Sequence, residues 1–479
     1  MKSRATIGKI LVKLFENREG ELDSYLLIVF LIVNGLVLFN ALFHDPIIQY
    51  DGGGHLAYVV TLANLHLPTA DESSEFFSPP LPYILPAAAK FVGCSLWWAA
   101  KVGQIVNVAL SLGITGLLIV LCRSARPSDT GNTALVALMF LGALPVYYKT
   151  MAFVRGEPYV AFLTLAAIAA SARALTFDKR SLADAIAPGL CWGLLILARQ
   201  WGALAAAGMV LAVWLAALRT RDGHKFMIGL IGSLIALLVG GWFYGWLWMS
   251  HGSPIAFNRP TGTMQWKLRN QPFDFYFGTG NGQLFADPVW PSFPNQLVPV
   301  FYAETWGDYW GYFLIYAKDL ASGTYEVDPL VEEAVNKPSA IIETNRFALN
   351  KYLGRVNLLG LLPTALALVA FGTAAVRLRT FVSHGGPVTL SEIIPIIATL
   401  VIAVSASGYL WFLVGYPNLG KGDTIKATYM LHVFAPLALL TADFVRRIGV
   451  PWRACFVGWG LLMMHNALAV TTHYITVPW

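Results

Sequence analysis

The sequence has 479 residues, of which 56% are hydrophobic and only 13% are charged, with a net charge of +6. A soluble globular chain carries about 25% charged residues, so this composition excludes a soluble protein. Many apolar runs exceed the roughly 18 residues that a membrane-crossing helix needs, and they are continuous rather than alternating, which excludes a β-barrel. We therefore expect an all-α polytopic membrane protein.

The basic residues and the cysteines indicate no further partner. Lys and Arg cluster in short loops, which is a topology signal, and no basic patch interleaves with stacking aromatics, so nucleic acid is not expected. The N-terminal stretch is basic and polar, and the apolar run after it is long enough to span, so we expect no cleavable signal. The cysteines lack metal or disulfide spacing and are interpreted as packing residues: Cys94, Cys122, Cys191 and Cys455.

About eleven membrane spans are expected, and the first is Ser24–Phe43. The stretch Ser181–Leu218 reads either as two short spans hinged at Arg199-Gln200-Trp201 or as one bent helix, and only the first reading keeps the later loops on their sides. The remaining spans are expected at Leu96–Leu121, Thr133–Tyr148, Pro158–Leu175, Leu182–Ala198, Gly202–Leu218, Phe226–Met249, Tyr352–Val376, Ile393–Val414, Ala427–Val445 and Trp452–His473.

The basic residues predict the orientation of these spans. Met1–Asp23 carries several Lys and Arg residues and is expected to be cytoplasmic, which makes the protein a multi-pass plasma (inner) membrane protein whose external side follows the first span. Alternation from this start gives inside loops that are all basic. They contain Arg123, Arg126, Arg173, Lys179, Arg180, Arg219, Arg221, Lys225, Arg377, Arg379, Arg446 and Arg447.

Three regions follow from this organisation: an N-terminal membrane module (1–250), a large external loop (251–351) and C-terminal membrane helices (352–479). The first external loop, 44–95, contains an interfacial helix over Leu56–Leu67, which Pro68 ends, and a second helical piece that runs to about Val92. The large loop is rich in Pro, Gly, Asn and aromatic residues, so we expect a small folded cap rather than disorder.

The run Tyr50-Asp51-Gly52-Gly53-Gly54-His55 follows the first span. Asp is a favoured helix cap, but three glycines make a poor first turn, since each costs about 0.5–1 kcal/mol relative to Ala. Glycines suit a backbone that approaches another group closely. We interpret Asp51 as a catalytic base at the external boundary. If the helix begins this early, His55 lies on the same helix face as Asp51. Its possible roles are a metal ligand, a group that orients Asp51, a contact with the acceptor or a structural histidine.

Three further groups are predicted on the external side. The turn Lys149…Arg155-Gly156-Glu157 fits a site, with Arg155 binding substrate and Glu157 catalytic, and equally fits snorkelling cations with a helix-start carboxylate. Arg199, Lys421, Lys426 and Tyr429 lie at two more external span ends. Cations at a lipid interface are singly typical anchors, but several on one face suit a phosphate.

The last of these three groups is the run Glu304-Thr305-Trp306-Gly307-Asp308-Tyr309-Trp310 in the large loop. Aromatic rings beside carboxylates suit stacking on a sugar and hydrogen bonds to its hydroxyls, so Trp306 and Asp308 are candidate substrate contacts; the same residues suit a cap that packs on itself. Interhelical hydrogen bonds explain the remaining polar residues in or near the spans, which are Asn107, Asp184, Asp443, His465 and Asn466.

In these residues the chain resembles the membrane glycosyltransferases of the GT-C superfamily, in the bacterial branch related to protein mannosyltransferases and lipid A aminoarabinose transferases. The similar features are the first-loop acid Asp51, the run Phe77-Ser78-Pro79-Pro80-Leu81-Pro82-Tyr83, the Arg155–Glu157 turn, the Trp-Gly-Asp-Tyr-Trp run and Lys426–Tyr429. Family members often carry Asp-Glu at the first-loop position, whereas Gly52 follows Asp51 here. The similarity is strongest over Tyr50–Val120.

The resemblance implies a donor sugar on a polyprenyl phosphate and its transfer, with inversion, to a lipid, glycan or protein hydroxyl outside the cytoplasm. Asp51 would take the acceptor's proton, and Arg155, Arg199, Lys421 and Lys426 would stabilise the leaving phosphate. A divalent metal held by Asp51 with Glu157 or His55 is possible. The first-loop helix and external span ends would form the groove for the polyprenyl chain.

Two other readings stay open. A transporter or flippase of a lipid-linked or small polar substrate would carry charges at mid-span, broken helices and internal repeats. A catalytically inactive scaffold with the same fold would keep the helices without the chemistry, and Gly52 leaves room for it.

Overall fold

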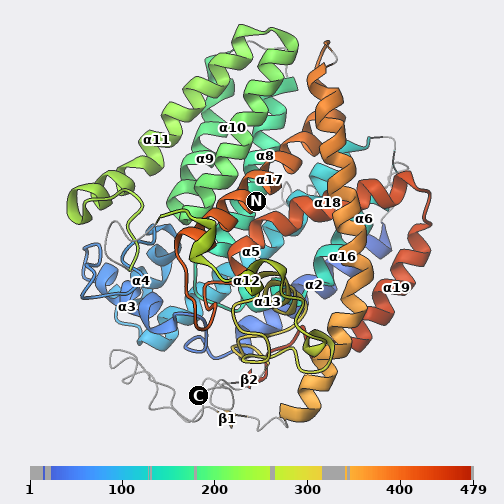
Figure 1. Ribbon diagram of the computed structural model, residues 1–479. Helices are drawn as coiled ribbons and strands as arrows, with labels where there is room; N and C mark the ends of the chain where they lie inside the picture. Colours follow the sequence, from blue (N-terminus) through green and yellow to red (C-terminus); the bar gives the residue numbers. More distant parts are fainter. Residues whose placement is uncertain are drawn as a thin grey trace, which may run out of the picture.

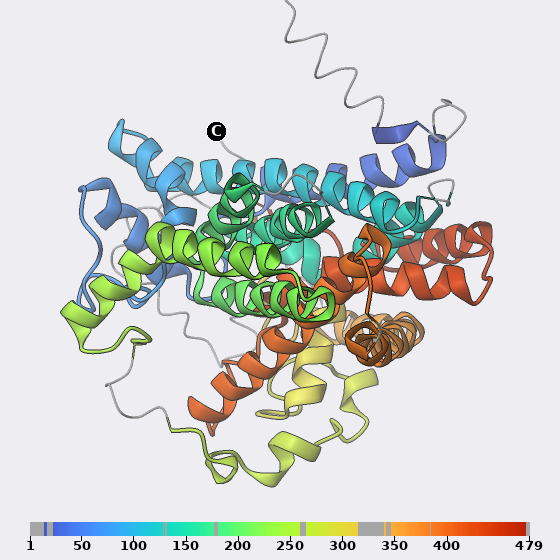
Figure 2. The same ribbon diagram turned by 90° about the horizontal axis from the view of Figure 1, so that it is seen from above.

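The computed structural model describes residues 14–16, 23–127, 129, 132–176, 181–258, 265–314, 340–341, 346–383 and 385–475. The expected basic N-terminal residues, Lys179, Arg180 and much of the later part of the large loop lie outside this range. In the described part, helices dominate (Figures 1 and 2), and the one departure from the expected all-α class is a two-stranded antiparallel pair of β1 (Ala340–Ile341) with β2 (Tyr474–Ile475).

Eight described helical segments are long and apolar enough to cross a membrane, which makes the chain a polytopic membrane protein. They are α2 (Ser24–Phe43), α5 (Leu96–Ala125), α8 (Glu157–Thr176), α10 (Gln200–Thr220), α11 (Gly223–His251), the Leu349–Ser383 part of α16 (Arg346–Ser383), α17 (Leu390–Gly415), and Ala427–Arg447, which joins η5 (Ala427–Met430) to α18 (Leu431–Arg447).

In the described part of the chain the structure has eight candidate spans, or nine with one bent pair, where about eleven were expected. The helix α6 (Asn132–Gly142) and α7 (Pro145–Met151) meet at a 71° bend and make at most one further span, giving nine. The described α9 (Ile186–Ala198), after η2 (Leu182–Ala185), and α19 (Trp452–His465) have 13 and 14 residues. At 1.5 Å per residue they cover about 20 Å, which is short of a hydrocarbon core of about 30 Å.

The ambiguous stretch before α10 folds as two helices. Arg199 has an extended backbone (φ −166°, ψ 155°) that separates α9 from α10, and the two helices lie side by side in Figure 1. The two-segment reading with its hinge at Arg199 is therefore confirmed, although α9 is shorter than a span.

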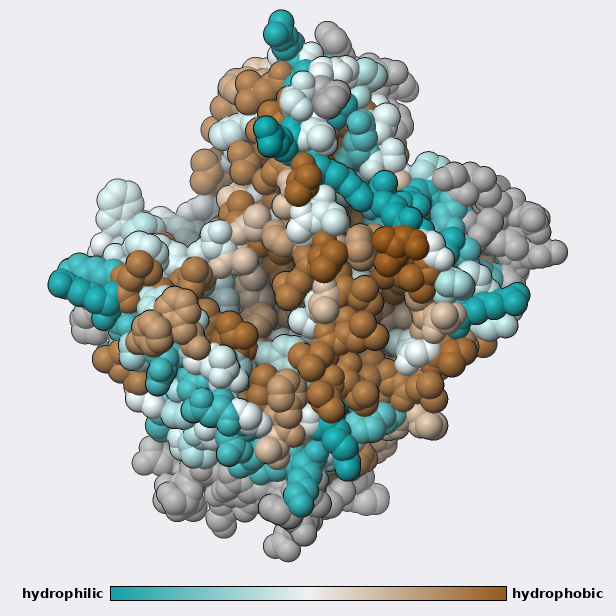
Figure 3. Space-filling view, turned by 45° about the vertical axis from the view of Figure 1, so that its right-hand side comes forward, coloured by the Kyte–Doolittle hydropathy of each residue, from teal (hydrophilic) through white to brown (hydrophobic). Residues whose placement is uncertain are grey.

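Predicted inside loops from distant parts of the sequence meet at one carboxylate. Asp443 near the end of α18 accepts hydrogen bonds from Arg126 at 2.6 Å, Arg377 at 2.9 Å and Arg447 at 2.7 Å. The loops after α5, α16 and α18 therefore lie on one side, as the alternation of the spans predicts. Figure 3 shows a hydrophobic area between hydrophilic ones, as expected for a surface that faces lipid.

The segment after α2, which the sequence predicts to be external, contains α3 (Gly52–Ala63), η1 (Leu81–Tyr83) and α4 (Ile84–Phe91). The helix α3 begins four residues before the expected start at Leu56, so glycines form its first turn. A Cβ on Gly52 would lie 2.7 Å from the carbonyl oxygen of Ile47, and one on Gly54 would meet Ser74 Oγ. These glycines allow the close approach that the sequence predicts, and they do so inside the helix.

The described part of the large loop packs on the membrane helices. It contains η3 (Leu268–Asn270), α12 (Phe273–Phe277), η4 (Gln283–Phe285) and α13 (Leu297–Trp306). Its Trp306 and Tyr309 are buried in the same apolar core as residues of α2, α8 and α18. In this part the loop is folded and buries aromatic residues, and its role as an external cap stays a prediction.

Candidate functional site

Asp51 sits at the start of α3 without capping it. Its backbone is left-handed (φ 54°, ψ 30°), and its side chain accepts no hydrogen bond from the first turn of the helix. Non-glycine residues adopt this conformation at a cost, and such strain concentrates at functional sites. Asp51 thus occupies the capping position while its carboxylate, 38% exposed, points elsewhere.

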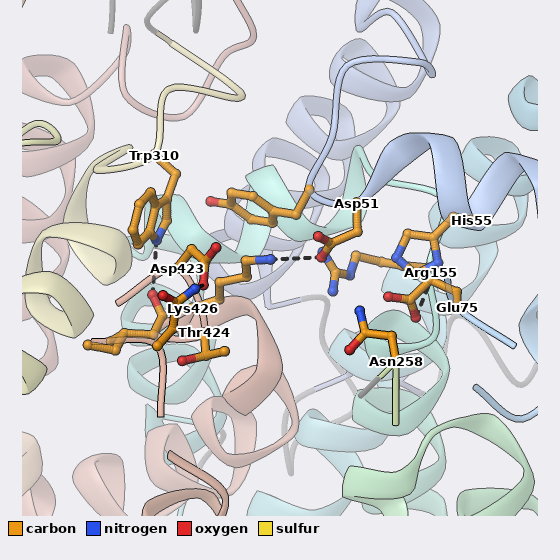
Figure 4. A network of polar contacts seen from close by, with 12 residues as sticks. Asp51, His55, Glu75, Arg155, Asn258, Trp310, Asp423, Thr424 and Lys426 are labelled. Carbon is orange, nitrogen blue, oxygen red and sulfur yellow. Dashed lines mark hydrogen bonds and ion pairs between the residues drawn. The ribbon is translucent and has the colours of Figure 1, made fainter. Parts of the chain in front are cut away.

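The carboxylate points to Lys426. Lys426 Nζ lies 2.7 Å from Asp51 Oδ2, and Figure 4 shows the two side chains extended toward each other. Burial raises the pKa of Asp51, but the ammonium group of Lys426 lowers it by a larger amount, so the pKa lies below its ordinary range. Burial lowers the pKa of Lys426, and Asp51 outweighs this effect and raises it. Both groups are charged at neutral pH.

Behind this pair lies a buried chain of alternating charges. Arg155 donates to both oxygens of Glu157, with Nε–Oε2 at 2.6 Å and Nη2–Oε1 at 3.1 Å. Arg199 Nε lies 3.2 Å from Glu157 Oε1, and its Nη1 donates to Glu75 Oε2 at 2.9 Å. Burial lowers the pKa of Arg199 and the two carboxylates raise it well above its ordinary value. Glu157 is therefore engaged by two arginines and is not poised as a base.

The Tyr50 ring places three of the cations. Lys426 Nζ lies 5.2 Å from its centroid, the Arg155 guanidinium 5.6 Å and Lys149 Nζ 5.7 Å. Arg155 and Lys426 also lie 5.4 and 5.6 Å from the centroid of Tyr429. Aromatic faces attract cations in a desolvated site, so these rings hold like charges close together.

A polar pocket of about 280 Å³ opens in front of this cluster. The predicted residues Asp51, Arg199, Lys426 and Tyr429 line it, and Figure 4 shows Asn258 facing Asp51 from the other side. Its other lining residues combine carbonyl, hydroxyl and carboxyl groups with aromatic rings: Glu75, Phe77, Gln200, Trp201, Phe257, Phe412, Tyr416, Asn418, Asp423 and Thr424. The pocket presents a carboxylate, cations and stacking faces to one small volume.

His55 lies on α3 beside this cluster, buried. Its Nδ1 contacts Tyr83 Oη at 2.7 Å, and its Nε2 has no partner among the described residues. Burial lowers the pKa of His55 well below its ordinary value, and Arg155 and Arg199 lower it further. The ring is neutral at physiological pH and does not line the pocket.

A second buried network supports the site from below. Tyr50 Oη donates to Glu304 Oε2 at 2.5 Å, and Lys149 Nζ lies 2.7 Å from the same oxygen. Burial raises the pKa of Glu304, Lys149 lowers it and Asp308 raises it again, with a net rise. Asp308 accepts from the backbone N–H groups of Phe313 and Leu314, both at 2.7 Å. The large loop thus fixes the Tyr50 ring under the cations.

Six of the predicted residues do not line the pocket: His55, Arg155 and Glu157 lie behind it, and Asp308, Trp306 and Lys421 lie elsewhere. Asp308 is spent on the backbone of its own loop. Trp306 is buried and donates through Nε1 to Thr364 Oγ1 at 2.9 Å, facing an apolar cavity instead. Lys421 Nζ lies 5.8 Å from the centroid of the Trp290 ring, so its side chain packs on the large loop. The contacts of these last three residues fit the alternative that the large loop packs on itself.

The donor set does not suit a metal. Among the described residues, no group of three or more His, Cys, Asp or Glu side chains could hold an ion. Of the predicted ligands, Asp51 is paired with Lys426, and both oxygens of Glu157 contact arginines, which repel a cation.

Sequence reasoning missed Glu75, Asn258 and the aromatic wall of Phe257, Phe412 and Tyr416. Glu75 lies 124 residues from its partner Arg199, and Phe412 comes from α17, whose apolar run gave no sign of a site. The available signal for Glu75 was its place two residues before the quoted Phe77-Ser78-Pro79-Pro80 run.

The sequence matches no family model and no curated protein. The chain is structurally similar to ArnT. The apo crystal structure of ArnT from Cupriavidus metallidurans aligns over 92% of this chain and 62% of that chain, with 14% identity and a TM-score of 0.47. The structure of ArnT bound to undecaprenyl phosphate aligns over 92% and 77%, with 14% identity and a TM-score of 0.41.

These alignments report a similarity of fold to ArnT at low sequence identity. The chain spans less than two thirds of the length of the apo ArnT chain. What the present chain binds and catalyses has to come from its own residues.

Proposed function

We propose that this protein is a membrane glycosyltransferase that moves a sugar from a polyprenyl phosphate to a hydroxyl group at the external surface of the membrane, with Asp51 as general base. One observation carries the proposal. The carboxylate of Asp51, a residue with a left-handed backbone whose side chain does not cap its helix, lines a pocket together with Lys426 and Arg199. A base and phosphate-binding cations at one cavity are the two parts that this reaction needs.

In the reaction, the acceptor oxygen attacks the anomeric carbon and forms the new C–O bond as the bond from that carbon to the phosphate oxygen breaks. The acceptor proton passes to Asp51, and the negative charge of the leaving phosphate develops beside Lys426 and Arg199. Arg155 lies behind them and carries one N–H group, Nη1, without a partner among the described residues. Attack from the face opposite the phosphate inverts the anomeric centre.

The Asp51–Lys426 pair gives the reaction an order. A carboxylate with a lowered pKa is a weak base, and Lys426 is the main group that lowers the pKa of Asp51. A sugar linked to a polyprenyl phosphate is a phosphodiester with one negative charge, which competes with the Asp51 carboxylate for the same ammonium group. Binding of the donor therefore draws Lys426 away and restores the basicity of Asp51, so that the base is active only when the donor is present.

An apolar cavity of about 410 Å³ supports the lipid-linked donor. It is lined by Trp306 of α13, Tyr409 of α17 and Phe434 of α18, among others. Tyr409 joins this cavity to the polar pocket, because its hydroxyl accepts from Lys426 N at 2.8 Å. A polyprenyl chain in the apolar cavity places its phosphate near Lys426. This cavity replaces the expected groove at the first-loop helix, whose apolar face packs on α4 and α5.

The opposite wall suits a sugar. The Phe412 ring lies 5.0 Å from Trp201 and 5.5 Å from Tyr416, centroid to centroid, so the rings form one continuous apolar face. Asn258 and Thr424 line the same pocket and offer amide and hydroxyl groups. Rings beside polar groups stack on a pyranose and hydrogen-bond its hydroxyls.

The geometry favours this reaction over transport. The charged residues that are fully buried in the described part lie at the helix ends around the Asp51 pocket: Lys149, Arg155, Glu157, Glu304 and Asp308. A transporter of a polar substrate places such groups near mid-span.

The test is a structure of the protein with polyprenyl phosphate added. We expect head-group density within contact distance of Lys426 Nζ and the Arg199 guanidinium, and chain density in the cavity beside Tyr409. Head-group density at another place on the protein contradicts the assignment of the pocket.

A further inference from the structure

A second polar cavity, of about 360 Å³, lies at the other end of the membrane helices. The helix α10 connects the two cavities: Gln200 at its start lines the Asp51 pocket, and Arg219 near its end lines the second one. Nineteen residues of helix separate them by about 29 Å. This cavity is independent of the proposed transfer chemistry.

Three arginines from three helices line this cavity. Arg219 comes from α10, Arg377 from α16 and Arg447 from α18, while Glu392 is the acidic lining residue. Arg377 and Arg447 share the carboxylate of Asp443 with Arg126. Each guanidinium has five N–H donors, whereas one carboxylate has about four acceptor sites, so Asp443 cannot satisfy these arginines. The cavity retains excess positive charge and free donor capacity.

Arg219 is built into the wall of the cavity. Its side chain is 6% exposed, its guanidinium lies 4.4 Å from the centroid of the Phe381 ring, and its Nη2 lies 3.1 Å from Glu392 Oε1. Its Nε is buried and has no hydrogen-bond partner among the described residues. A buried donor without a partner is costly, and an acceptor in the cavity removes the cost.

The first turn of α17 adds to this preference. Ser391 lines the cavity, and the helix that begins at Leu390 runs for 26 residues away from it. The N-terminus of a long helix carries partial positive charge and favours an anion. Thr389 and Glu392 form the capping box of this helix, which fixes the turn.

Apolar side chains beside the cavity identify the source of the anion. Leu218 precedes Arg219 and is 71% exposed, and Val376 precedes Arg377 and is 69% exposed. Leu390 is exposed next to Ser391. A phosphate held by the arginines would therefore have apolar surface next to it, which suits acyl chains and not a free ion. Basic pockets between membrane helices bind anionic lipid head groups in this way.

We propose that Arg219, Arg377 and Arg447 form a binding site for the phosphate of an anionic phospholipid at the face opposite the Asp51 pocket. The lipid ties the ends of α10, α16, α17 and α18 together. Arg447 and Arg377 contact the phosphate from the open side of the cavity, and Arg219 Nε contacts it from the wall.

The test uses the full-length protein in detergent micelles doped with phosphatidylglycerol or phosphatidylcholine, and in sodium phosphate without lipid. We expect phosphatidylglycerol alone to raise Tm in a concentration-dependent way, and native mass spectrometry to detect a retained phosphatidylglycerol molecule. An equal effect of phosphatidylcholine overturns the proposal. A rise in Tm of the same size with sodium phosphate overturns the assignment to lipid.

Variants locate the site. Arg447→Gln and Arg377→Gln are expected to weaken retention of phosphatidylglycerol at least tenfold, since each removes one cation that contacts the phosphate. Each variant leaves Asp443 with two other arginines, so its carboxylate stays paired. Arg379→Gln is the matched control, because this residue is exposed on the same helix end and does not line the cavity. Equal retention in all three variants overturns the proposal. The comparison of lipids in the wild type remains decisive if a variant does not fold.

Discussion

Lys426 Nζ lies 2.7 Å from Asp51 Oδ2, although the two residues are 375 positions apart in the sequence. The pair joins the first external loop to the segment before η5, and both side chains line the same pocket. In the proposed reaction, Lys426 keeps the pKa of Asp51 low until a donor phosphate binds the ammonium group instead of Asp51. The following experiments examine the parts of this arrangement.

Replacement of Lys426 by Met removes the ammonium group and keeps the length of the side chain. We expect weaker binding of polyprenyl phosphate and sugar transfer that is lower by about 10²- to 10³-fold, the usual effect of losing one group that stabilises transition-state charge. Lys426→Arg retains the charge and should recover part of both. The measurement is polyprenyl phosphate binding together with initial rates. Unchanged binding in Lys426→Met contradicts contact of this residue with the phosphate.

Glu304→Gln leaves Lys149, which is fully buried, without its closest carboxylate partner. Removing one partner of a buried ion pair costs about 3–5 kcal/mol, so we expect a marked fall in Tm. Lys149→Met alone should also destabilise, and the double variant should recover part of the loss because no charge stays buried alone. Thermal unfolding of the four proteins checks this. Additive losses in the double variant contradict a direct pairing.

Gly54→Ala tests the close approach at the start of α3. The new Cβ would meet Ser74 Oγ and would lie 3.1 Å from Glu75 Cγ, so the segment that carries Glu75 has to move. Because Glu75 contacts Arg199, we expect lower transfer activity as well as a lower Tm. Gly35→Ala is the control, since a Cβ there has open space. Wild-type activity and Tm in Gly54→Ala contradict the contact.

The buried ring of His55 predicts a pH dependence of stability. Burial lowers its pKa well below the ordinary 6.5, so the unfolded chain gains a proton below pH 6.5 that the folded chain does not bind. Stability is therefore lost as the pH falls below this value. In His55→Gln this contribution disappears, and the wild type should lose stability relative to the variant by up to about 1.4 kcal/mol per pH unit.

Thermal unfolding of both proteins from neutral to acidic pH measures this difference. His66→Gln is the control, because His66 is exposed and hydrogen-bonded to Glu72, which raises its pKa. A Tm difference between the wild type and His55→Gln that stays constant with pH contradicts a buried, neutral imidazole.

The arrangement of the helices was predictable because its signals are local. Apolar run length gives most of the spans and basic loops predict their sides, so Asp51, Arg155, Arg199 and Lys426 were expected at one end of the helices, where their side chains lie close together. Run length gave the end of α9 at Ala198 but could not show that the expected span Thr133–Tyr148 breaks between Gly142 and Pro145. This break depends on how neighbouring helices pack.

The pairing of charges was not predictable. Glu157 read as a catalytic residue, yet Arg155 and Arg199 occupy both its oxygens. Asp308 read as a sugar contact, yet it binds its own backbone. Composition shows that a carboxylate stands near cations, whereas its partner is set by how the helices and loops pack in the folded chain.

The most direct test of the central claim is single-turnover sugar transfer by Asp51→Asn with a polyprenyl-phosphate-linked sugar, compared with the wild type. Asp274→Asn serves as the control, because Asp274 is exposed in the large loop outside the pocket. We predict that Asp51→Asn binds the donor but transfers sugar about 10²- to 10⁴-fold more slowly, the range expected for loss of a general base, while Asp274→Asn matches the wild type. Full transfer by Asp51→Asn would contradict the account.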